Sequence, residues 1–228
     1  MYTTMNLLLV FLLGITVAVF GYNEYGGGRG NHHGRPRPPP RPPVRPRPPP
    51  PPPAPPAPRC PSGWLQFNRP RGRWCVRVVH ANKSYYGAQI QCAEMGGTLS
   101  GVQTQAERMA IANEGRRIQR AFGIGDGSIW LGARRKASCP RKNSCSAVNT
   151  FHWVDGFTTG TDGIHFSPGQ PDGLLYGQTA QDCIQQFIYP WADTSPTWPG
   201  IPHGAFDDQW CSWTTGPVNR FFACGKRA

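Results

Sequence analysis

The sequence has no pair of cysteines or histidines at the close spacing that zinc sites use. Its eight cysteines never occur as CxxC, and its six histidines never occur as HxxxH. Structural zinc sites usually draw their four ligands from such close pairs. We therefore do not expect the cysteines to bind zinc.

An organised catalytic group is also absent. No serine occupies a nucleophile elbow of the form GxSxG. His152, His165 and His203 are the candidates for acid–base chemistry with Asp207, but no activated nucleophile accompanies them. His152 lies in a strand-like segment and is expected to be structural or to face solvent. The chain is expected not to be an enzyme.

Long hydrophobic runs are scarce, and the single one is Met5–Phe20. It is short for a membrane span, no Lys or Arg precedes it, and seven arginines follow it before Cys60. It predicts a secretory signal peptide over residues 1–21, with small residues suited to cleavage after Gly21. An uncleaved anchor is the alternative. We expect a secreted, extracellular protein with no membrane span after cleavage.

Secretion would place the cysteines in an oxidising compartment, where an even number usually means disulfides. All eight lie from Cys60 onward, and the sequence alone leaves 105 possible pairings. The Asn82-Lys83-Ser84 sequon predicts a surface glycan on Asn82, which fits a secreted glycoprotein.

Residues 22–59 are rich in Gly and Arg, then in Pro and Arg, and contain almost nothing that a core would bury. Proline removes the backbone donors of helices and sheets, so a polyproline II stalk is expected from Arg35 to Pro58. At about 3.1 Å per residue this run would reach roughly 75 Å. Its arginines would attract polyanions such as acidic polysaccharides. A plain linker is the alternative, and the compartment argues against nucleic acid.

Positive charge is not confined to the stalk. Residues 60–228 hold seventeen Lys or Arg and eleven acidic residues, a net charge of +6. One basic cluster contains Arg69, Arg71 and Arg73; a second, around Cys139 and Cys145, contains Arg134, Arg135, Lys136, Arg141 and Lys142. These clusters are candidate polyanion contacts, and the alternative is ordinary solvated loop charge.

From Cys60 the composition becomes that of a folded domain, so a boundary at about residue 59 is predicted. Short apolar runs predict strands at 74–76, 78–79, 129–132, 151–154, 183–184 and 221–224. Ser84 is the expected cap of a first helix that ends at Gly96-Gly97. Thr104 and Glu107 form a capping box for a second helix that ends before Gly123.

Three motifs occur together in order. They are Ile129-Trp130-Leu131-Gly132, Phe151-His152-Trp153-Val154-Asp155-Gly156 and Gln170-Pro171-Asp172. Together they resemble the C-type lectin-like domain over essentially all of residues 60–224. The resemblance implies an α+β fold in which two helices flank small antiparallel sheets with a long irregular loop region. It also implies disulfides Cys60–Cys75, Cys92–Cys224 and Cys183–Cys211, which leaves Cys139 and Cys145 for a fourth.

The resemblance further implies a Ca²⁺ site. Its ligands would be Gln170, Asp172, Gln181, Asp207 and Asp208, and Pro171 would be cis so that its neighbours point into the site. Gln-Pro-Asp resembles the tripeptide of galactose-type members. Gln170, Asp172 and Asp207 would then contact the sugar, and Tyr176 would stack on it.

Two positions depart from the family pattern. Gln181 stands where a Glu is usual, and Asp207 stands where an Asn is usual, so three carboxylates remain. The first hypothesis is a galactose-type lectin that binds glycans or extracellular glycoproteins through Ca²⁺. The second is a structural, matrix or protein-binding module without Ca²⁺-dependent sugar binding, whose basic tail contacts polyanions. The long segment 188–204 would either extend the binding surface or pack over the domain.

Overall fold

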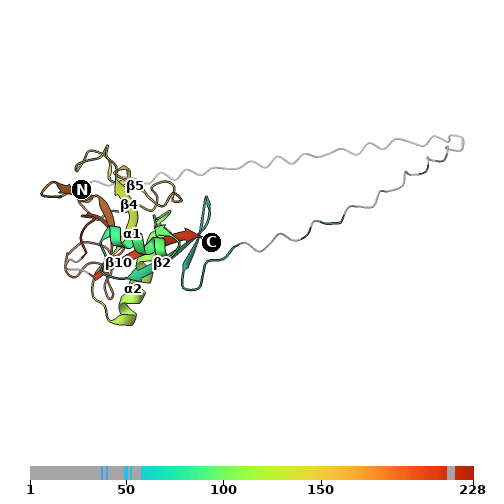
Figure 1. The fold of residues 1–228 in the computed structure, drawn as a ribbon, viewed down its shortest axis with the longest axis horizontal. Helices are drawn as coiled ribbons and strands as arrows, with labels where there is room; N and C mark the ends of the chain where they lie inside the picture. Colours follow the sequence, from blue (N-terminus) through green and yellow to red (C-terminus); the bar gives the residue numbers. More distant parts are fainter. Residues whose placement is uncertain (1–36, 38–39, 41–48, 51, 53–57, 215–218) are drawn as a thin grey trace, which may run out of the picture. The chain divides into compact units, whose positions relative to one another are not determined.

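The computed structural model describes residues 37, 40, 49–50, 52, 58–214 and 219–228 (Figure 1). The predicted signal peptide and most of the predicted stalk lie outside these residues, so both remain predictions. The chain divides into two units, 1–53 and 54–228. The few described residues of the first unit are exposed and without regular structure. Everything below concerns the second unit.

The second unit is built on one mixed sheet in the order β1-β2-β10-β4-β8-β9, with β3 paired to β10 and β5 paired to β4. Its strands are β1 (Leu65–Arg69), β2 (Gly72–His80), β3 (Thr98–Leu99), β4 (Gly127–Arg135), β5 (Phe151–Trp153), β8 (Cys183–Ile188), β9 (Phe206–Gln209) and β10 (Asn219–Arg227). All pairs are antiparallel except β10 with β4. A separate hairpin joins β6 (Leu175–Tyr176) to β7 (Thr179–Ala180).

Both helices begin where the sequence predicts. In α1 (Tyr85–Glu94) the Ser84 side chain accepts a hydrogen bond from the Gly87 N–H. In α2 (Gln105–Phe122) the Thr104 hydroxyl accepts one from the Glu107 N–H, and Gly123 ends the helix in the left-handed conformation. The caps satisfy donors that the helix itself leaves unpaired. The expected helix boundaries are therefore confirmed.

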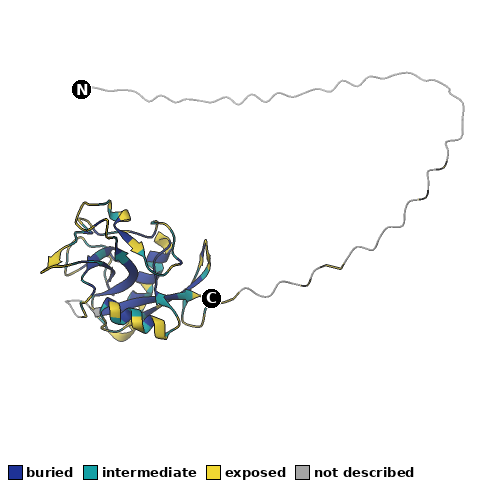
Figure 2. Cartoon of the chain, turned by 45° about the horizontal axis from the view of Figure 1, so that its top comes forward, coloured by how far each residue is buried: buried dark blue, intermediate teal, exposed yellow. Residues whose placement is uncertain are grey.

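Two apolar clusters fill the unit. The larger lies between α2 and the sheet and includes Val76, Ile111, Ile129 and Phe221. The smaller surrounds Trp130 and lies beneath α1. The central strands are buried along their length, whereas the helices keep exposed outer faces (Figure 2). Phe122 lies in the last turn of α2 and is 77% exposed.

Four disulfides brace this unit, in the pairings implied by the resemblance and by the two remaining cysteines. They are Cys60–Cys75, Cys92–Cys224, Cys139–Cys145 and Cys183–Cys211. The bond from Cys92 to Cys224 closes 132 residues and ties α1 to β10. The bond from Cys139 to Cys145 closes a local loop of sequence separation 6.

The segment 188–204 follows β8 and packs against α2. Arg116 donates hydrogen bonds to the carbonyls of Tyr189 at 2.9 Å and Ala192 at 2.6 Å, and Arg120 donates to the carbonyl of Pro190. Charged donors bonded to carbonyls are stronger than neutral ones. Two helical arginines thus hold the loop over the edge of the sheet.

Arg69 differs from the sequence prediction. Its guanidinium forms a buried ion pair with Glu107 at 2.8 Å and lies 3.6 Å from Asp155. It also donates to the Gly101 carbonyl at 3.0 Å. With its side chain fully buried, Arg69 joins the β1–β2 hairpin to the start of α2 and is not a polyanion contact. Arg71 remains exposed.

Candidate functional site

The Gln170-Pro171-Asp172 loop lies against the end of β9. The peptide bond between Gln170 and Pro171 is cis, as the resemblance implies. The Asp172 N–H donates to Gln170 Oε1 at 2.8 Å and to Asp208 Oδ1 at 3.0 Å. The Gly173 N–H donates to Asp208 Oδ2 at 2.8 Å. The tripeptide loop and Asp208 are therefore brought together through backbone donors.

Gly173 allows the tripeptide loop to come this close to Asp208. Its φ of 61° lies in the left-handed region, and a Cβ at this position would lie 3.3 Å from the Arg135 guanidinium. A larger residue would meet both backbone strain and a close contact. The loop therefore directs two successive N–H groups at one buried carboxylate.

Arg135 occupies the centre of this arrangement. Its guanidinium forms an ion pair with the Asp208 carboxylate, and the two side chains are 3% and 0% exposed. The same guanidinium donates to the carbonyls of Gln181 at 3.0 Å and Cys139 at 3.3 Å, and lies 3.5 Å from Asp182. A buried charge requires such partners. Arg135 is thus a structural cation, and the expectation that it contacts external polyanions as an exposed charge is corrected.

Opposing effects act on the Asp208 carboxyl. Burial raises its pKa, while the hydrogen bond from Gly173 and the positive charge of Arg135 lower it. The carboxylate accepts two backbone N–H groups and a guanidinium. These three donors compensate a charge that would otherwise be costly to bury.

Both carboxylate oxygens of Asp172, which were also expected to hold Ca²⁺, are engaged in hydrogen bonds. Asp172 Oδ1 accepts from the Leu174 N–H at 3.2 Å, and Asp172 Oδ2 accepts from Gln170 Nε2 at 3.3 Å. Gln181 is buried, and its amide nitrogen donates to Gln209 Oε1 at 3.4 Å. Gln181 Oε1 is buried without a hydrogen-bond partner. Among the expected ligand oxygens, Gln181 Oε1 and Asp207 Oδ1 are the two that are buried and unpaired.

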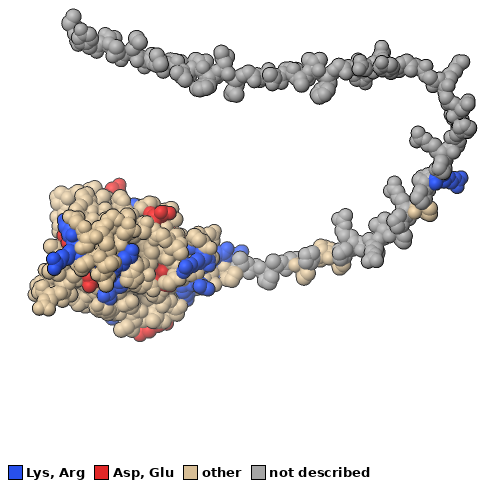
Figure 3. Space-filling model, turned by 90° about the horizontal axis from the view of Figure 1, so that it is seen from above, with Lys and Arg blue, Asp and Glu red and all other residues tan. Residues whose placement is uncertain are grey.

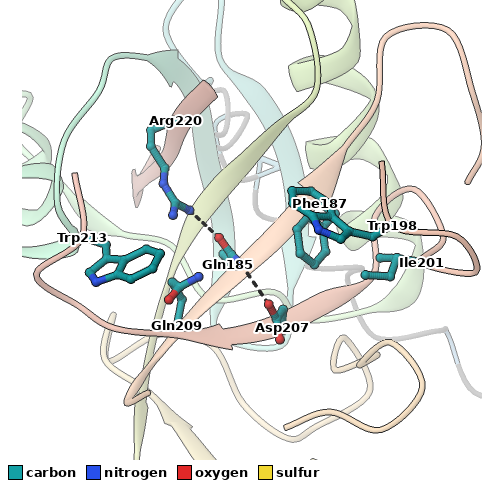
Figure 4. A pocket seen from close by; sticks show the side chains of 8 residues that line it. All are labelled: Gln185, Phe187, Trp198, Ile201, Asp207, Gln209, Trp213 and Arg220. Atoms are coloured by element: carbon teal, nitrogen blue, oxygen red, sulfur yellow. Dashed lines mark hydrogen bonds between the residues drawn. The ribbon is translucent and has the colours of Figure 1, made fainter. Parts of the chain in front are cut away.

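Asp207 lies on the other face of β9. Successive residues of a strand point to opposite faces, so Asp207 is separated from Asp208 by the sheet. Its Oδ2 accepts from Gln185 Nε2 at 3.0 Å, and it lines a cavity with Phe187 and Trp198 (Figure 4). Burial raises the pKa of Asp207 to about 7, with smaller contributions from the charges of Asp208 and Asp172.

These contacts do not fit a Ca²⁺ site. Within residues 58–214 and 219–228, no three acidic, histidine or cysteine side chains gather closely enough to hold a metal ion. Ca²⁺ takes six to eight oxygen ligands. Here the Asp208 carboxylate is bound by a guanidinium, and Asp207 points away. The positive charge beside the tripeptide comes from Arg135.

A basic cavity adjoins the tripeptide. We use this name for the hollow of about 200 Å³ lined by Arg135, Arg141, Lys142, Asn143, Cys145, Ala147, Thr150, Gly169, Gln170 and Pro171. Arg141 and Lys142 are exposed at its edge and belong to the loop that the Cys139–Cys145 disulfide closes. Lys and Arg side chains form patches on the face of this unit seen in Figure 3, where acidic groups are scattered.

Tyr176 lies away from these groups. It is 73% exposed on the β6–β7 hairpin, and its ring stacks edge-on against Trp210 at 6.2 Å. The sequence missed the pairing of Arg135 with Asp208. The register of β4 with β8 sets Arg134 opposite Cys183 and places Arg135 next to Asp182, a long-range feature that the sequence does not display.

The structure also describes Asn82 and His152, for which the sequence made predictions. Asn82 is exposed, and its Oδ1 accepts a hydrogen bond from the Arg220 N–H at 3.2 Å. A glycan on Asn82 remains a prediction. His152 is exposed on β5. Neither helix among the described residues is long and apolar enough to cross a membrane.

The two helices, the mixed sheet, the long loops and the four disulfides define a C-type lectin-like domain. The family model described as C-type lectin domain-containing protein 141/158 matches residues 58–222, and the chain belongs to the C-type lectin domain family.

Relatives of several kinds share this fold. A type-2 ice-structuring protein from Hemitripterus americanus is 23% identical over 157 residues, which cover 69% of this chain and 76% of the relative. Human lithostathine is 21% identical, with a TM-score of 0.48, and the match covers 75% of this chain and 92% of that one. The cow carbohydrate-recognition domain of CD23 is 17% identical, with a TM-score of 0.47, and the match covers 75% and 97%.

Proposed function

We propose that this protein is a secreted lectin-like binding module that recognises anionic groups on extracellular glycans or glycoproteins without using Ca²⁺. The observation that carries the proposal is the ion pair of Arg135 with Asp208 at the position where the family's metal ligands are expected. An arginine fixed there balances the charge of Asp208 at every calcium concentration. The proposed module therefore needs no metal to organise the tripeptide loop.

The basic cavity supports an anionic ligand. Arg141 and Lys142 stand exposed at its edge, and Arg135 closes its inner side. Guanidinium groups match the geometry of carboxylates, sulfates and phosphates, and they are always charged. The net charge of +6 on residues 60–228 would also attract polyanions from a distance. The Pro/Arg segment would add further positive charge outside the folded unit.

The galactose-type hypothesis remains the competing function. The cis peptide at Pro171 and the partnerless Oε1 of Gln181 favour it. For Ca²⁺ to bind, however, Asp208 would have to leave its guanidinium and two backbone donors. Breaking a buried ion pair of this kind costs about 3–5 kcal/mol. A cation would have to recover that energy before binding any sugar.

Retention of the full chain on heparin and on immobilised galactose, each with Ca²⁺ and with EDTA, tests the proposal. We expect salt-sensitive retention on heparin that EDTA does not change, and no retention on galactose. Calcium-dependent retention on galactose would contradict it.

A variant pair separates the basic cavity from overall charge. The double variant Arg141→Gln, Lys142→Gln should elute from heparin at lower salt. Each lost contact with an anionic group reduces the slope of log affinity against log salt concentration by roughly one. Arg77→Gln with Lys83→Gln removes the same charge from exposed positions outside the cavity and is the matched control. Equal shifts for both pairs would mean that only net charge matters.

A further inference from the structure

A second cavity lies on the opposite face of β9 from the tripeptide. We call this hollow of about 240 Å³ the aromatic cavity; it is lined by Gln185, Phe187, Trp198, Ile201, Asp207, Gln209, Trp213 and Arg220 (Figure 4). Its residues come from β8, β9, β10, the loop that follows β8 and the turn that follows β9. None of them lines the basic cavity.

The aromatic cavity has apolar walls on two sides. Phe187, Trp198 and Ile201 stand on one side and Trp213 on the other (Figure 4). The rings of Phe187 and Trp198 are 5.7 Å apart, and those of Trp213 and Trp210 are 4.7 Å apart. The Ser195 hydroxyl accepts a hydrogen bond from the Trp198 N–H at 2.8 Å, which holds the backbone of Trp198 in place. The walls are therefore formed before a ligand enters.

The floor is a chain of polar side chains with one acceptor left over. Arg220 donates to Gln185 Oε1 and, at 2.6 Å, to the Ser128 hydroxyl. Gln185 Nε2 donates to Asp207 Oδ2 at 3.0 Å, so both ends of the Gln185 amide are used. Asp207 Oδ1 is buried and has no hydrogen-bond partner among the described residues. A buried acceptor left unpaired costs about 1–3 kcal/mol, so such an atom calls for a partner.

We propose that the aromatic cavity receives a tryptophan or tyrosine side chain of a protein partner, whose single N–H or O–H group donates to Asp207 Oδ1. The walls would pack on the ring, and the unpaired acceptor would bind the polar end. This inference rests on the proposed function only in taking the domain to be a binding module. Aromatic side chains of this kind are the usual anchors of protein interfaces.

Size and polarity favour this ligand over others. A cavity of about 150 Å³ already holds benzene, so 240 Å³ accommodates an indole or a phenol. A monosaccharide carries several hydroxyl groups, whereas Asp207 Oδ1 is the one unpaired acceptor of this floor. A lysine side chain would bring its charge close to the buried guanidinium of Arg220.

Titration of the full chain in EDTA with indole and with p-cresol, followed by calorimetry, tests the inference. Toluene is the matched ligand without a donor, and D-galactose is the matched sugar. We expect dissociation constants on the order of millimolar for indole and p-cresol, because ligands with so few atoms make few contacts in total. Toluene should bind about tenfold more weakly, since it cannot donate to a carboxylate. Galactose should not bind.

Variants locate the binding. Asp207→Asn keeps the side-chain shape and introduces the residue that the family pattern has here. Its carbonyl oxygen would accept from Gln185, which turns the –NH₂ group toward the ligand. This should weaken indole and p-cresol about tenfold and leave toluene unchanged. Trp198→Ala should weaken all three, and Trp191→Ala should change none, because Trp191 is 76% exposed on the same loop and outside the cavity.

Three outcomes would overturn the inference. They are equal binding of indole and toluene, indole binding that Asp207→Asn leaves intact, and absence of binding, which would mean that Oδ1 is bound by water only. Galactose binding that depends on Asp207 would make the cavity a sugar site instead. None of these results bears on heparin retention, so the proposed function and this inference fail separately. Far-ultraviolet circular dichroism of each variant checks that the fold is retained.

Discussion

Arg135 and Asp208 form a buried ion pair at the point where the tripeptide loop meets the end of β9. The guanidinium reaches the carbonyls of Gln181 and Cys139 as well. One side chain therefore joins β4, β9 and the Cys139–Cys145 loop. The guanidinium of Arg135 is thus the positive charge that connects these parts.

Arg135→Met should destabilise the protein by about 3–5 kcal/mol, because it leaves Asp208 buried without its counter-ion. The loss should be measured by urea unfolding. Arg134→Met is the matched control: its guanidinium lies over the rings of Tyr85 and Tyr86 at 5.8 and 5.7 Å. Arg134 is half-buried, and such contacts are worth from about 0.5 to about 2 kcal/mol. Similar losses for both variants would argue against a structural role for the ion pair.

Glu107→Gln should also cost up to about 3–5 kcal/mol, because it leaves the buried guanidinium of Arg69 with only the Asp155 carboxylate, 3.6 Å away. Glu114→Gln, on the same helix, provides the comparison. Glu114 pairs with Arg117, whose side chain is 66% exposed, and exposed pairs contribute about 0.2–1 kcal/mol. Chemical denaturation of the two variants should therefore separate them clearly. Equal stability would mean that the Arg69 cluster does not hold α2 to the hairpin.

Stability should fall in mild acid because of His203. Burial, together with the charge of Arg116, lowers the pKa of His203 to about 4, whereas the unfolded value is about 6.5. The Nδ1 atom of His203 accepts from the Tyr189 N–H at 3.1 Å, which requires an unprotonated nitrogen. The neutral ring thus contributes stability above pH 6.5, and this contribution is lost as pH falls toward 4. The expected loss is up to about 3 kcal/mol.

His203→Asn supplies the control for this pH dependence. The Asn carbonyl oxygen can replace Nδ1 as the acceptor for Tyr189, but it does not titrate. Unfolding free energies measured between pH 7 and pH 4 should fall less steeply for the variant than for the wild type. Parallel curves would show that His203 is not the group that titrates.

Removing the Cys139–Cys145 disulfide should affect binding more than folding. A loop this short gains only about 2–2.5 kcal/mol from closure, roughly half of what the 132-residue loop of Cys92–Cys224 gains. Replacing both Cys139 and Cys145 by Ser should therefore leave a folded protein. It should lower the salt concentration at which the chain leaves heparin, since Arg141 and Lys142 lie within that loop. Unchanged elution would show that the Cys139–Cys145 loop does not take part in anion binding.

Much of the fold was predictable because its signals are local. Ser84 and Thr104 cap the helices, and Gly123 ends the second one, as the sequence indicates. Short-range patterns fix these features whatever the rest of the chain does. The disulfide pairing was not local, and only resemblance to the lectin-like family implied it.

The site was predicted less well because long-range contacts determine it. From the sequence, Asp172, Asp207 and Asp208 form one set of three charges, but strand alternation sends Asp207 to the other face of β9. Arg69 and Arg135 belong to basic clusters in the sequence, although each is paired with a carboxylate, 38 and 73 residues away respectively. A cluster of basic residues indicates local positive charge. The residues next to it in the sequence do not reveal a carboxylate that pairs with it from a distant part of the chain.

Calcium titration followed by thermal unfolding tests the central claim most directly. A ligand at 100 times its dissociation constant stabilises a protein by about 2.7 kcal/mol. If Arg135 replaces the metal, the melting temperature of the full chain should be the same in 10 mM CaCl₂ as in EDTA. The Arg135→Met variant, in contrast, should gain stability from calcium. A saturable, calcium-dependent rise in the melting temperature of the wild type would contradict the account.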